Sequence, residues 1–332
     1  MPRALETLVE VYADRLQAVR RARASGLVPV AYVGSDVPRE LVAAAGFLPL
    51  RIAGEPCESL VDEHILGTGV DPVARTQLCS ILRLGGTLFD RLIVSHDGEG
   101  SLRLFHALRE LRRWEPERPL PELHFFDFLH QARASTRRYD LQRLEELVAV
   151  LERWSGRRIG ERELGRALAE EDEKHRLLRQ LQALRTQVPV QVSGVEALAI
   201  VGASTALPAS EFNALLEGAL QELGQRAPIV GTRVFVTGSD WDHCSVYAAI
   251  EAQGCVVVGE DHDWGDRAIR SAPIAIASGE PLLALAESYL RAPPAGRGSS
   301  SVVRAQYTVQ GALRAHAERV LCVLRAGDDA PA

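Results

Sequence analysis

Carboxylate and imidazole side chains gather directly after two apolar runs, VFVTG and GCVVVG, in the second half of the chain. The residues are Asp240, Asp242, His243, Glu260, Asp261, His262, Asp263 and Asp266. Oxygen and nitrogen donors of this kind can hold a divalent metal ion, or can take up and release protons during a reaction. The same residues also suit a polar loop that caps the next helix. The sequence leaves both interpretations open.

Two turns with the sequence Gly-Ser-Asp follow apolar runs in the two halves of the chain. Gly34-Ser35-Asp36 follows VAYV, and Gly238-Ser239-Asp240 follows VFVT. Backbone and hydroxyl donors at Ser35 and Ser239 can hold a phosphate or a carbonyl oxygen near a helix N-terminus. Tight turns alone explain these glycines equally well. The repeated pattern suggests two related α/β units.

The cysteines do not form a recognisable framework. They are Cys57, Cys79, Cys244, Cys255 and Cys322, without a CxxC pair. An odd number at wide spacings fits neither a set of disulfides nor a zinc ribbon, so we expect reduced thiols that mostly act as small buried hydrophobes. The chain has neither a GxSxG pattern nor a glycine-rich dinucleotide fingerprint, which leaves serine hydrolase and NAD-binding functions without support.

Composition restricts the class of protein. The 332 residues include 38 basic and 44 acidic side chains, a net charge of 38 − 44 = −6, and 46% are hydrophobic. This is enough apolar material for two cores, and there is no basic surplus to neutralise nucleic-acid phosphates. No apolar run approaches the roughly 18 residues of a membrane span, and the N-terminus lacks the features of a signal peptide. We expect a cytoplasmic protein without nucleic-acid or membrane partners.

Alternating apolar runs and amphipathic stretches predict parallel βαβ units in the first part of the chain. Strands are expected at 27–36, 89–96 and 122–128, and a helix is expected over 38–50, which opens with Pro38. In a doubly wound sheet, ligands bind beyond the carboxyl ends of the strands.

Charged amphipathic helices without strand patterns then dominate, and strand-like runs return near residue 228. These later runs are TRVFVTGSD (232–240), GCVVVGED (254–261), APIAIASG (272–279) and RVLCVLRAG (319–327). The predicted fold is α/β, with two similar doubly wound domains, each with a parallel sheet, and a helical segment between them. The predicted divisions are an N-terminal helix (1–26), a first α/β domain (27–130), a helical segment (131–227) and a C-terminally short second domain (228–332).

Several stretches follow one another in a specific order along the chain. They are VPVAYVGSDVPRELVAAAGFLPLRI, CSILR, FDRLIVSHDGEGSLRLFHALREL, LERWSGRRIGERELGRAL with the helix that follows it, and GCVVVGEDHDWGDR. In this order they resemble the family of 2-hydroxyacyl-CoA dehydratase and benzoyl-CoA reductase subunits. The resemblance covers nearly the whole chain. No single motif is as distinctive as a P-loop, but the ordered set is specific.

The resemblance implies a two-domain α/β subunit that pairs with a homologous subunit. It also implies a [4Fe-4S] cluster, held by cysteines in the cleft between the domains, and an ATP-dependent activator protein that supplies a low-potential electron. The substrate would be an acyl-CoA that reacts as a ketyl radical, which makes the chain part of a lyase or an oxidoreductase. Soft thiolate ligands suit such a cluster.

The family's ligand positions carry over only in part. By resemblance, Cys79 stands at the first ligand cysteine, whereas His96 and Asp263 stand where the family has cysteines, and Gly327 replaces another near the last strand. Cys79, His96 and Asp263 are thus the candidate cluster or metal positions, expected to converge in the cleft. Cys57 and Cys322 are possible substitutes for a missing ligand.

Two functions follow from this incomplete match. In the first, the chain is a subunit that handles the acyl-CoA radical reaction, with Ser35 and Ser239 holding a CoA phosphate or the thioester carbonyl. In the second, it is a cluster-free, catalytically degenerate scaffold or regulatory partner of an active homologous subunit. The acyl group is not specified by the sequence.

Overall fold

A four-stranded parallel sheet forms the centre of the first half of the chain in the computed structural model, which describes residues 3–54, 65–67, 69–131, 133–274, 280–294, 299–326 and 328. Its strand order is β2-β1-β3-β4. The strands are β1 (Val28–Val33), β2 (Phe47–Arg51), β3 (Arg91–Ser95) and β4 (Glu122–Phe126). All three pairings are parallel. Every carboxyl end therefore lies at the same edge of the sheet.

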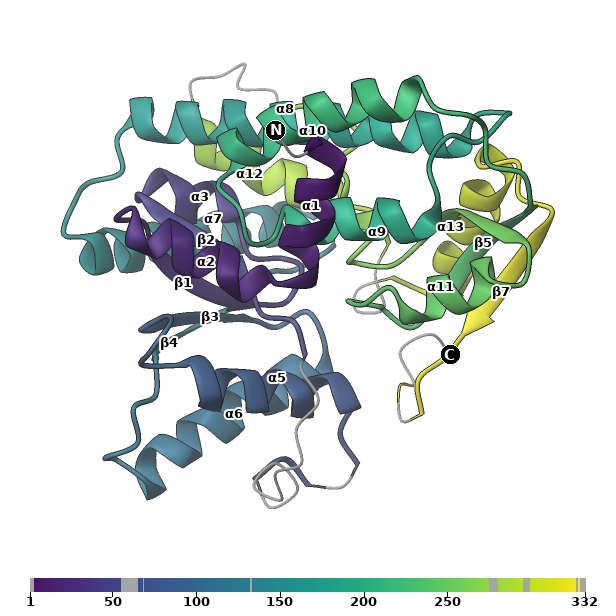
Figure 1. Cartoon of the computed structure of the whole chain (residues 1–332). Helices are drawn as coiled ribbons and strands as arrows, with labels where there is room; N and C mark the ends of the chain where they lie inside the picture. The colour runs from purple at the N-terminus through teal and green to yellow at the C-terminus, as the bar shows by residue number, and fades with distance from the viewer. Residues whose placement is uncertain are drawn as a thin grey trace.

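Helices cover both faces of this sheet. One face packs against α3 (Arg39–Ala44), α7 (Ala134–Ser155) and α12 (Pro281–Leu290). The other packs against α2 (Arg15–Ala24), α5 (Pro72–Leu84) and α6 (Glu99–Trp114), and Figure 1 shows α5 and α6 beneath β3 and β4. Alternate residues of β1 face opposite layers, Val30 one core and Ala31 the other, which is the doubly wound arrangement.

The helix predicted over 38–50 is wrong in its second half. Helix α3 ends at Ala44, and Phe47–Arg51 forms β2, paired with β1. Gly46 adopts φ +84°, a left-handed conformation that stops the helix and turns the chain into the strand. Pro49 is tolerated because β2 lies at the sheet edge, where one side needs no backbone donor.

A three-stranded parallel sheet, in the order β6-β5-β7, forms the centre of the second half. The strands are β5 (Thr232–Gly238), β6 (Cys255–Glu260) and β7 (Arg319–Val323). One face packs against α9 (Gly194–Ala203) and α11 (Ser245–Glu251), and the other against α13 (Ser301–Arg314). Of the strand predicted at 272–279, residues 272–274 are not part of a strand, and 275–279 lie outside the described residues.

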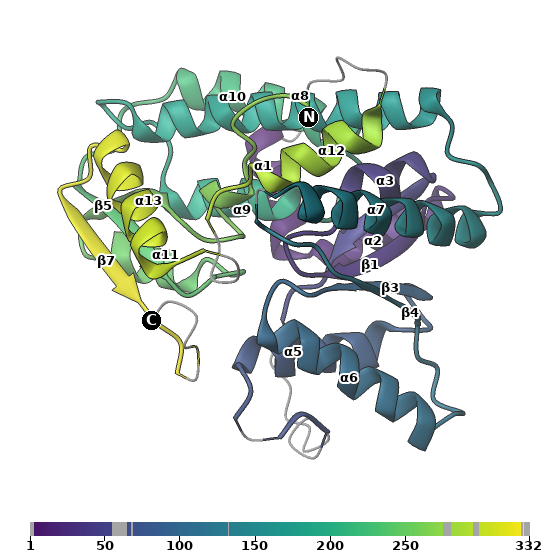
Figure 2. The same ribbon diagram turned by 180° about the vertical axis from the view of Figure 1, so that it is seen from behind.

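Long helices connect the two sheets. Helix α8 (Glu161–Thr186) packs against α3 of the first half and against β6 of the second. Helix α10 (Ala209–Gly224) lies beside α8, and α1 (Ala4–Ala13) packs against α10 and α9. From behind, Figure 2 shows α12 next to α7, with α13 in front of the second sheet. The predicted N-terminal helix is divided at Asp14, whose side chain accepts a hydrogen bond from the backbone of Gln17 and so starts α2.

The structure is thus α/β with two parallel sheets and many helices, as the alternation of patterns predicts. Within the described ranges, no helix has the length and apolar character that crossing a membrane requires.

Candidate functional site

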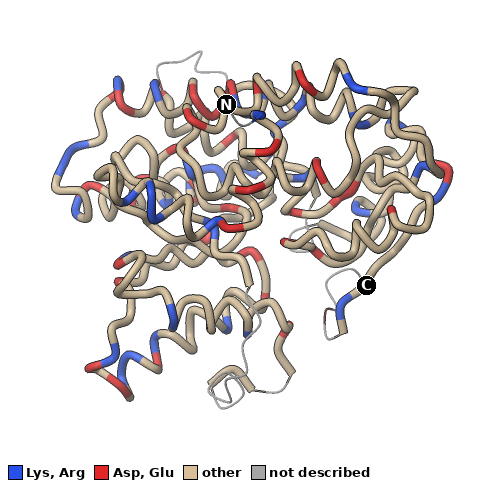
Figure 3. The backbone as a smooth tube through the Cα atoms, viewed as in Figure 1, with Lys and Arg blue, Asp and Glu red and all other residues tan. Residues whose placement is uncertain are grey.

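A cleft of about 990 Å³ opens where the carboxyl ends of the two sheets face each other. The first half contributes the residues after β1 and β3 and the start of α5, and the second contributes those after β5, β6 and β7. This is where open parallel sheets bind ligands. Figure 3 shows Lys and Arg interspersed with Asp and Glu along both halves, and side chains of both signs line the cleft.

The two Gly-Ser-Asp turns form equivalent bends at the ends of the central strands. Gly34 adopts φ +100° and Gly238 adopts φ +115°. A Cβ at Gly34 would lie 2.6 Å from the Cβ of Ser95, and one at Gly238 would lie 2.4 Å from the carbonyl oxygen of Val323. Both positions need glycine for its conformation and for the close approach of a neighbouring strand. The turns therefore define the base of the cleft.

The serines of these turns have different surroundings. Ser35 is half-buried, and its backbone nitrogen donates to Oδ2 of Asp97 at 2.8 Å. Ser239 is only 1% exposed, and its Oγ accepts a hydrogen bond of 2.9 Å from the backbone of Arg325. Ser35 lines a cavity beside the cleft, whereas Ser239 is not among the described lining residues of either cavity.

Of the three candidate ligand positions, His96 and Asp263 line the same cleft. His96 comes directly after β3, and its Nδ1 lies 3.0 Å from Oδ1 of Asp127. The other carboxylate oxygen of Asp127 accepts a hydrogen bond of 2.8 Å from the hydroxyl of Tyr139. These contacts fix the orientation of the imidazole ring at the wall of the cleft.

Two arginines engage Asp263. Arg267 donates to Oδ1, and Nη2 of Arg51 lies 4.0 Å from Oδ2. Burial alone would raise the pKa of Asp263, but the two guanidinium groups outweigh it and lower the pKa below its usual value. Asp263 is therefore a paired carboxylate, and its lone pairs are directed at arginine donors.

Two further carboxyl groups meet at the cleft and have raised pKa values. Burial, reinforced by the charges of Asp36 and Asp263, raises the pKa of Asp97 to about 6. Burial and the nearby Asp263 also raise the pKa of Asp240, whose Oδ1 accepts the backbone N–H of Asp263 at 2.9 Å. Around neutral pH, Asp97 can thus gain or lose a proton when a ligand changes its surroundings.

Cys79, the third candidate, lies on α5 and is half-buried. Gln77 on the same helix lines the cleft, and Cys79 is not among the described lining residues. Two residues turn a helix by about 200°, which directs Cys79 away from the side that Gln77 presents. Cys79 is disulfide-bonded, contrary to the expectation of a reduced thiol. Cys57 and Gly327 lie outside the described residues.

The donors that the described residues offer do not fit an iron-sulfur cluster. Such clusters need several thiolates, and of the free cysteines in this part of the chain only Cys322 lines the cleft. His96 and Asp263 are already held by Asp127 and by arginines. Across the described ranges, no three or more His, Cys, Asp or Glu side chains are grouped so that they could hold a metal ion.

The acidic and imidazole residues after β5 and β6 point to separate partners. Glu260 pairs with Arg185, and Tyr247 contacts Glu260 at 3.0 Å and His262 at 2.7 Å. Asp242 accepts the backbone N–H of Gly54 at 2.8 Å. These contacts support the interpretation as buried and capping polar groups, and they give the metal-site interpretation no support.

The arginines that cross the cleft were not among the sequence candidates. Arg51 at the end of β2 reaches Asp263, and Arg325 after β7 reaches Asp71 at 3.3 Å on the opposite side. Arg51 could not be recognised in the sequence as a cleft residue, because the strand that places it has the apolar pattern of a continuing helix. Arg325 could have been recognised, because it directly follows an apolar strand and binding sites lie at the carboxyl ends of such strands.

Two parallel sheets whose carboxyl ends face one ligand-sized cleft define the chain as an α/β protein of the doubly wound class. Residues 35–325 match the family described as 2-hydroxyglutaryl-CoA dehydratase, D-component, and the chain belongs to this family. It is also similar to a benzoyl-CoA reductase subunit of Thauera aromatica, with 26% identity over 271 residues, which is 79% of this chain and 67% of that protein.

Proposed function

We propose that the chain is one subunit of a 2-hydroxyacyl-CoA dehydratase or benzoyl-CoA reductase type of system, and that its cleft receives an acyl-CoA. Family membership over residues 35–325 supports the type of system. The cleft volume of about 990 Å³ lies at the upper end of the range for ligand pockets, roughly 300–1,000 Å³. Arg103 and Arg304 lie in its wall, and guanidinium groups suit phosphate oxygens.

The chain's own part in this proposal is to bind and orient the acyl-CoA, not to hold a cluster. The observation that carries this choice is the state of Asp263, which pairs with Arg267 and Arg51 at a position where the family resemblance places a cysteine. A carboxylate so engaged is a poor ligand for iron, since binding it would leave two partly buried guanidinium groups without their partner. Low-potential electron transfer and ketyl radical chemistry would then belong to a homologous subunit, which an ATP-dependent activator serves.

The test is anaerobic co-purification with a homologous subunit that retains its cysteines, followed by iron and sulfide analysis of the complex and of each separated subunit. We expect the complex to contain iron and sulfide and both to remain with the homologous subunit. About four iron and four sulfide per molecule of this chain alone would contradict the cluster-free role.

A second candidate is that this chain holds a metal or cluster through Cys79, His96 and Asp263. The convergence of His96 and Asp263 in one cleft favours it. Its test is iron content after anaerobic reconstitution of wild type and of Cys79→Ser. Loss of bound iron in the variant alone would support this candidate, because reduction of its disulfide during reconstitution would make Cys79 the thiolate among the three positions, and the substitution removes it.

A further inference from the structure

A second cavity, the side pocket, adjoins the cleft and has a different lining. Its volume is about 200 Å³, and its walls include Tyr32, Ser35, Arg39, Arg267, Arg270 and Tyr289. It shares Arg51, Asp263 and Arg267 with the cleft, so a ligand in the cleft can extend into it. A volume of this size exceeds what several water molecules need and suits a small organic group.

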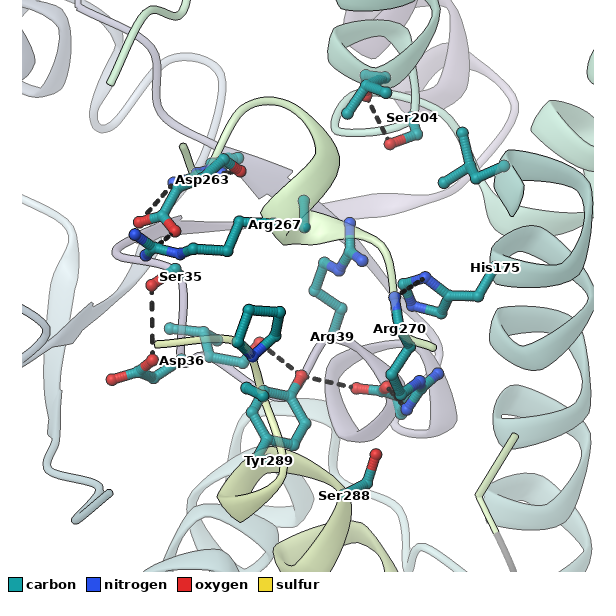
Figure 4. A pocket seen from close by; sticks show the side chains of 18 of the residues that line it. Ser35, Asp36, Arg39, His175, Ser204, Asp263, Arg267, Arg270, Ser288 and Tyr289 are labelled. Atoms are coloured by element: carbon teal, nitrogen blue, oxygen red, sulfur yellow. Dashed lines mark hydrogen bonds and ion pairs between the residues drawn. The ribbon is translucent and has the colours of Figure 1, made fainter. Parts of the chain in front are cut away.

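Four arginines in its wall are largely buried. The side chains of Arg39, Arg51, Arg267 and Arg270 are 17%, 11%, 13% and 14% exposed. In Figure 4, the side chain of Arg39 extends to the middle of the group, between Arg267 and His175. Buried guanidinium groups are costly unless their donors find acceptors, so their gathering around one cavity calls for an anionic partner.

The carboxylates around the pocket do not use all of these donors. Arg270 contacts Glu40 at 2.9 Å and Asp172 at 3.3 Å, yet its buried Nε has no hydrogen-bond partner among the described residues. Arg39 lies 3.5 Å from Glu171, which Lys174 already contacts. The wall therefore retains donors that an incoming acceptor can satisfy.

The charges limit the size of the ligand's own charge. The lining contains five arginines, Arg39, Arg51, Arg267, Arg270 and Arg291, and three carboxylates, Asp36, Glu40 and Asp263. Their ion-pair partners and the residues directly behind them add one cation, Lys174, and three anions, Glu171, Asp172 and Glu287. The sum is six cations and six anions. Without a surplus of positive charge, the pocket suits the single charge of a carboxylate better than the double charge of a phosphate dianion.

Neighbouring polar groups are already satisfied and orient the arginines. The backbone N–H of Arg270 donates to Nδ1 of His175 at 3.1 Å, so that this ring nitrogen is an acceptor. The hydroxyl of Tyr289 donates to Oε2 of Glu40 at 3.0 Å. These bonds hold Glu40 against Arg270 and give the pocket a fixed shape before a ligand arrives.

We propose that the side pocket binds a small carboxylate through Arg39 and Arg270. The carboxylate can be the far end of an acyl group whose thioester lies in the cleft, which rests on the proposed function, or it can be a free small carboxylic acid. In either case the pocket disfavours an aromatic or aliphatic end, because such a group would desolvate the guanidinium donors without accepting a hydrogen bond.

The experiment is calorimetric titration of the full chain with glutaryl-CoA, butyryl-CoA, benzoyl-CoA and CoA, and with free glutarate. For an acyl-end carboxylate, we expect glutaryl-CoA to bind about tenfold or more tightly than butyryl-CoA and benzoyl-CoA, the equivalent of one good charge-assisted contact. Arg39→Gln should remove that difference and leave CoA binding unchanged. Arg39→Lys should retain part of it, because it keeps the charge without the planar fork.

Arg226→Gln serves as the matched control. Arg226 pairs with Glu196 at 2.6 Å, is 29% exposed and lies in neither cavity, so its loss should not alter any of these affinities. Thermal melts of all variants separate loss of binding from loss of folding. If Arg39→Gln does not fold, Arg39→Lys and the comparison of ligands on wild type still decide the matter.

The outcomes distinguish the two proposals. Equal affinity for the three thioesters, together with no binding of glutarate, would overturn the carboxylate pocket and leave the proposed function standing. Binding of glutarate in an Arg39-dependent manner, with no binding of any CoA compound, would support the pocket as a site for a free acid and contradict the proposed function. No binding of any ligand would overturn both.

Discussion

Arg51 and Asp263 join the two sheets at the cleft, although 212 positions separate them in the chain. Nη1 of Arg51 donates to the carbonyl oxygen of Asp263 at 2.8 Å, and its guanidinium lies over the ring of Trp264, 4.2 Å from the centroid. Asp263, one of the candidate ligand positions, is therefore part of the contact between the two halves. Its side chain and its backbone both contribute to that contact.

Replacing Arg51 by glutamine should destabilise the protein by about 1–3 kcal/mol, the usual range for losing hydrogen bonds to charged groups in a partly buried site. Urea denaturation measures this as a lower midpoint. Arg103→Gln is the control, because Arg103 and its partner Glu99 are 49% and 70% exposed and such pairs contribute about 0–1 kcal/mol. An equal effect of the two substitutions would show that the contact between Arg51 and Asp263 adds nothing.

The glycines of the twin turns should not tolerate a side chain. Gly34→Ala and Gly238→Ala each force a left-handed backbone on alanine and bring its Cβ within 2.6 Å or less of a neighbouring strand. We expect each to lower the free energy of unfolding by at least about 1–3 kcal/mol. Gly165→Ala, within α8 and with open space around its Cβ position, should instead stabilise by about 0.5–1 kcal/mol. Unfolding curves showing the three variants alike would contradict this.

Much of the fold was predictable because its signals are local. Buried parallel strands are short apolar runs, and the Gly-Ser-Asp turns mark where β1 and β5 end. The strand β2 was missed because FLPLR directly continues the apolar pattern of α3, and the break depends on the left-handed φ of Gly46. A glycine in a sequence does not reveal which sign its φ will take.

The site was predictable only where a single strand end decides the position. His96 and Asp263 each follow a strand, so sheet topology alone brings them to one cleft. The partners of Asp263 come from another sheet and from the following turn, and no local pattern encodes which donors will reach it. Resemblance could not predict which way Cys79 faces. Cys79 lies within a helix, and the side of the helix that meets the cleft depends on the rotation of the helix about its axis.

The network behind the cleft should make stability depend on pH in two directions. Burial and the charge of Glu260 raise the pKa of Asp266 to about 7, so the folded state keeps a proton that the unfolded state has released. Stability therefore falls as pH rises from about 4 to about 7. Burial alone would raise the pKa of Glu260, but Arg185 outweighs it and lowers this pKa to about 2. The stability that the ionised Glu260 contributes is therefore lost as pH falls from about 4.5 towards 2.

Asp266→Asn isolates the first effect. Asparagine is neutral at every pH, so the variant should gain stability relative to wild type between pH 5 and pH 8, as urea denaturation at the two values will show. Asp14→Asn is the control: this exposed residue caps α2, and asparagine caps equally well, so we expect the same small difference from wild type at both pH values. If Asp266→Asn behaved like this control, ionisation of Asp266 would cost no stability in the folded state, which would contradict the prediction.

Cys322 offers a direct probe of the cleft. It is exposed and lines the cleft, whereas Cys244 and Cys255 are half-buried, so a maleimide should modify Cys322 faster than either, by roughly tenfold or more, because access controls the rate. Site-resolved peptide mass spectrometry of timed samples measures the three rates, and Cys322→Ser should leave the rates at Cys244 and Cys255 unchanged.

The same reaction can locate the ligand. If an acyl-CoA occupies the cleft, saturating CoA should slow the reaction at Cys322 alone. A bulky adduct at Cys322 should in turn weaken CoA binding. Modification of Cys322 at the same rate with and without CoA, under conditions where calorimetry detects CoA binding, would place the ligand elsewhere on the molecule.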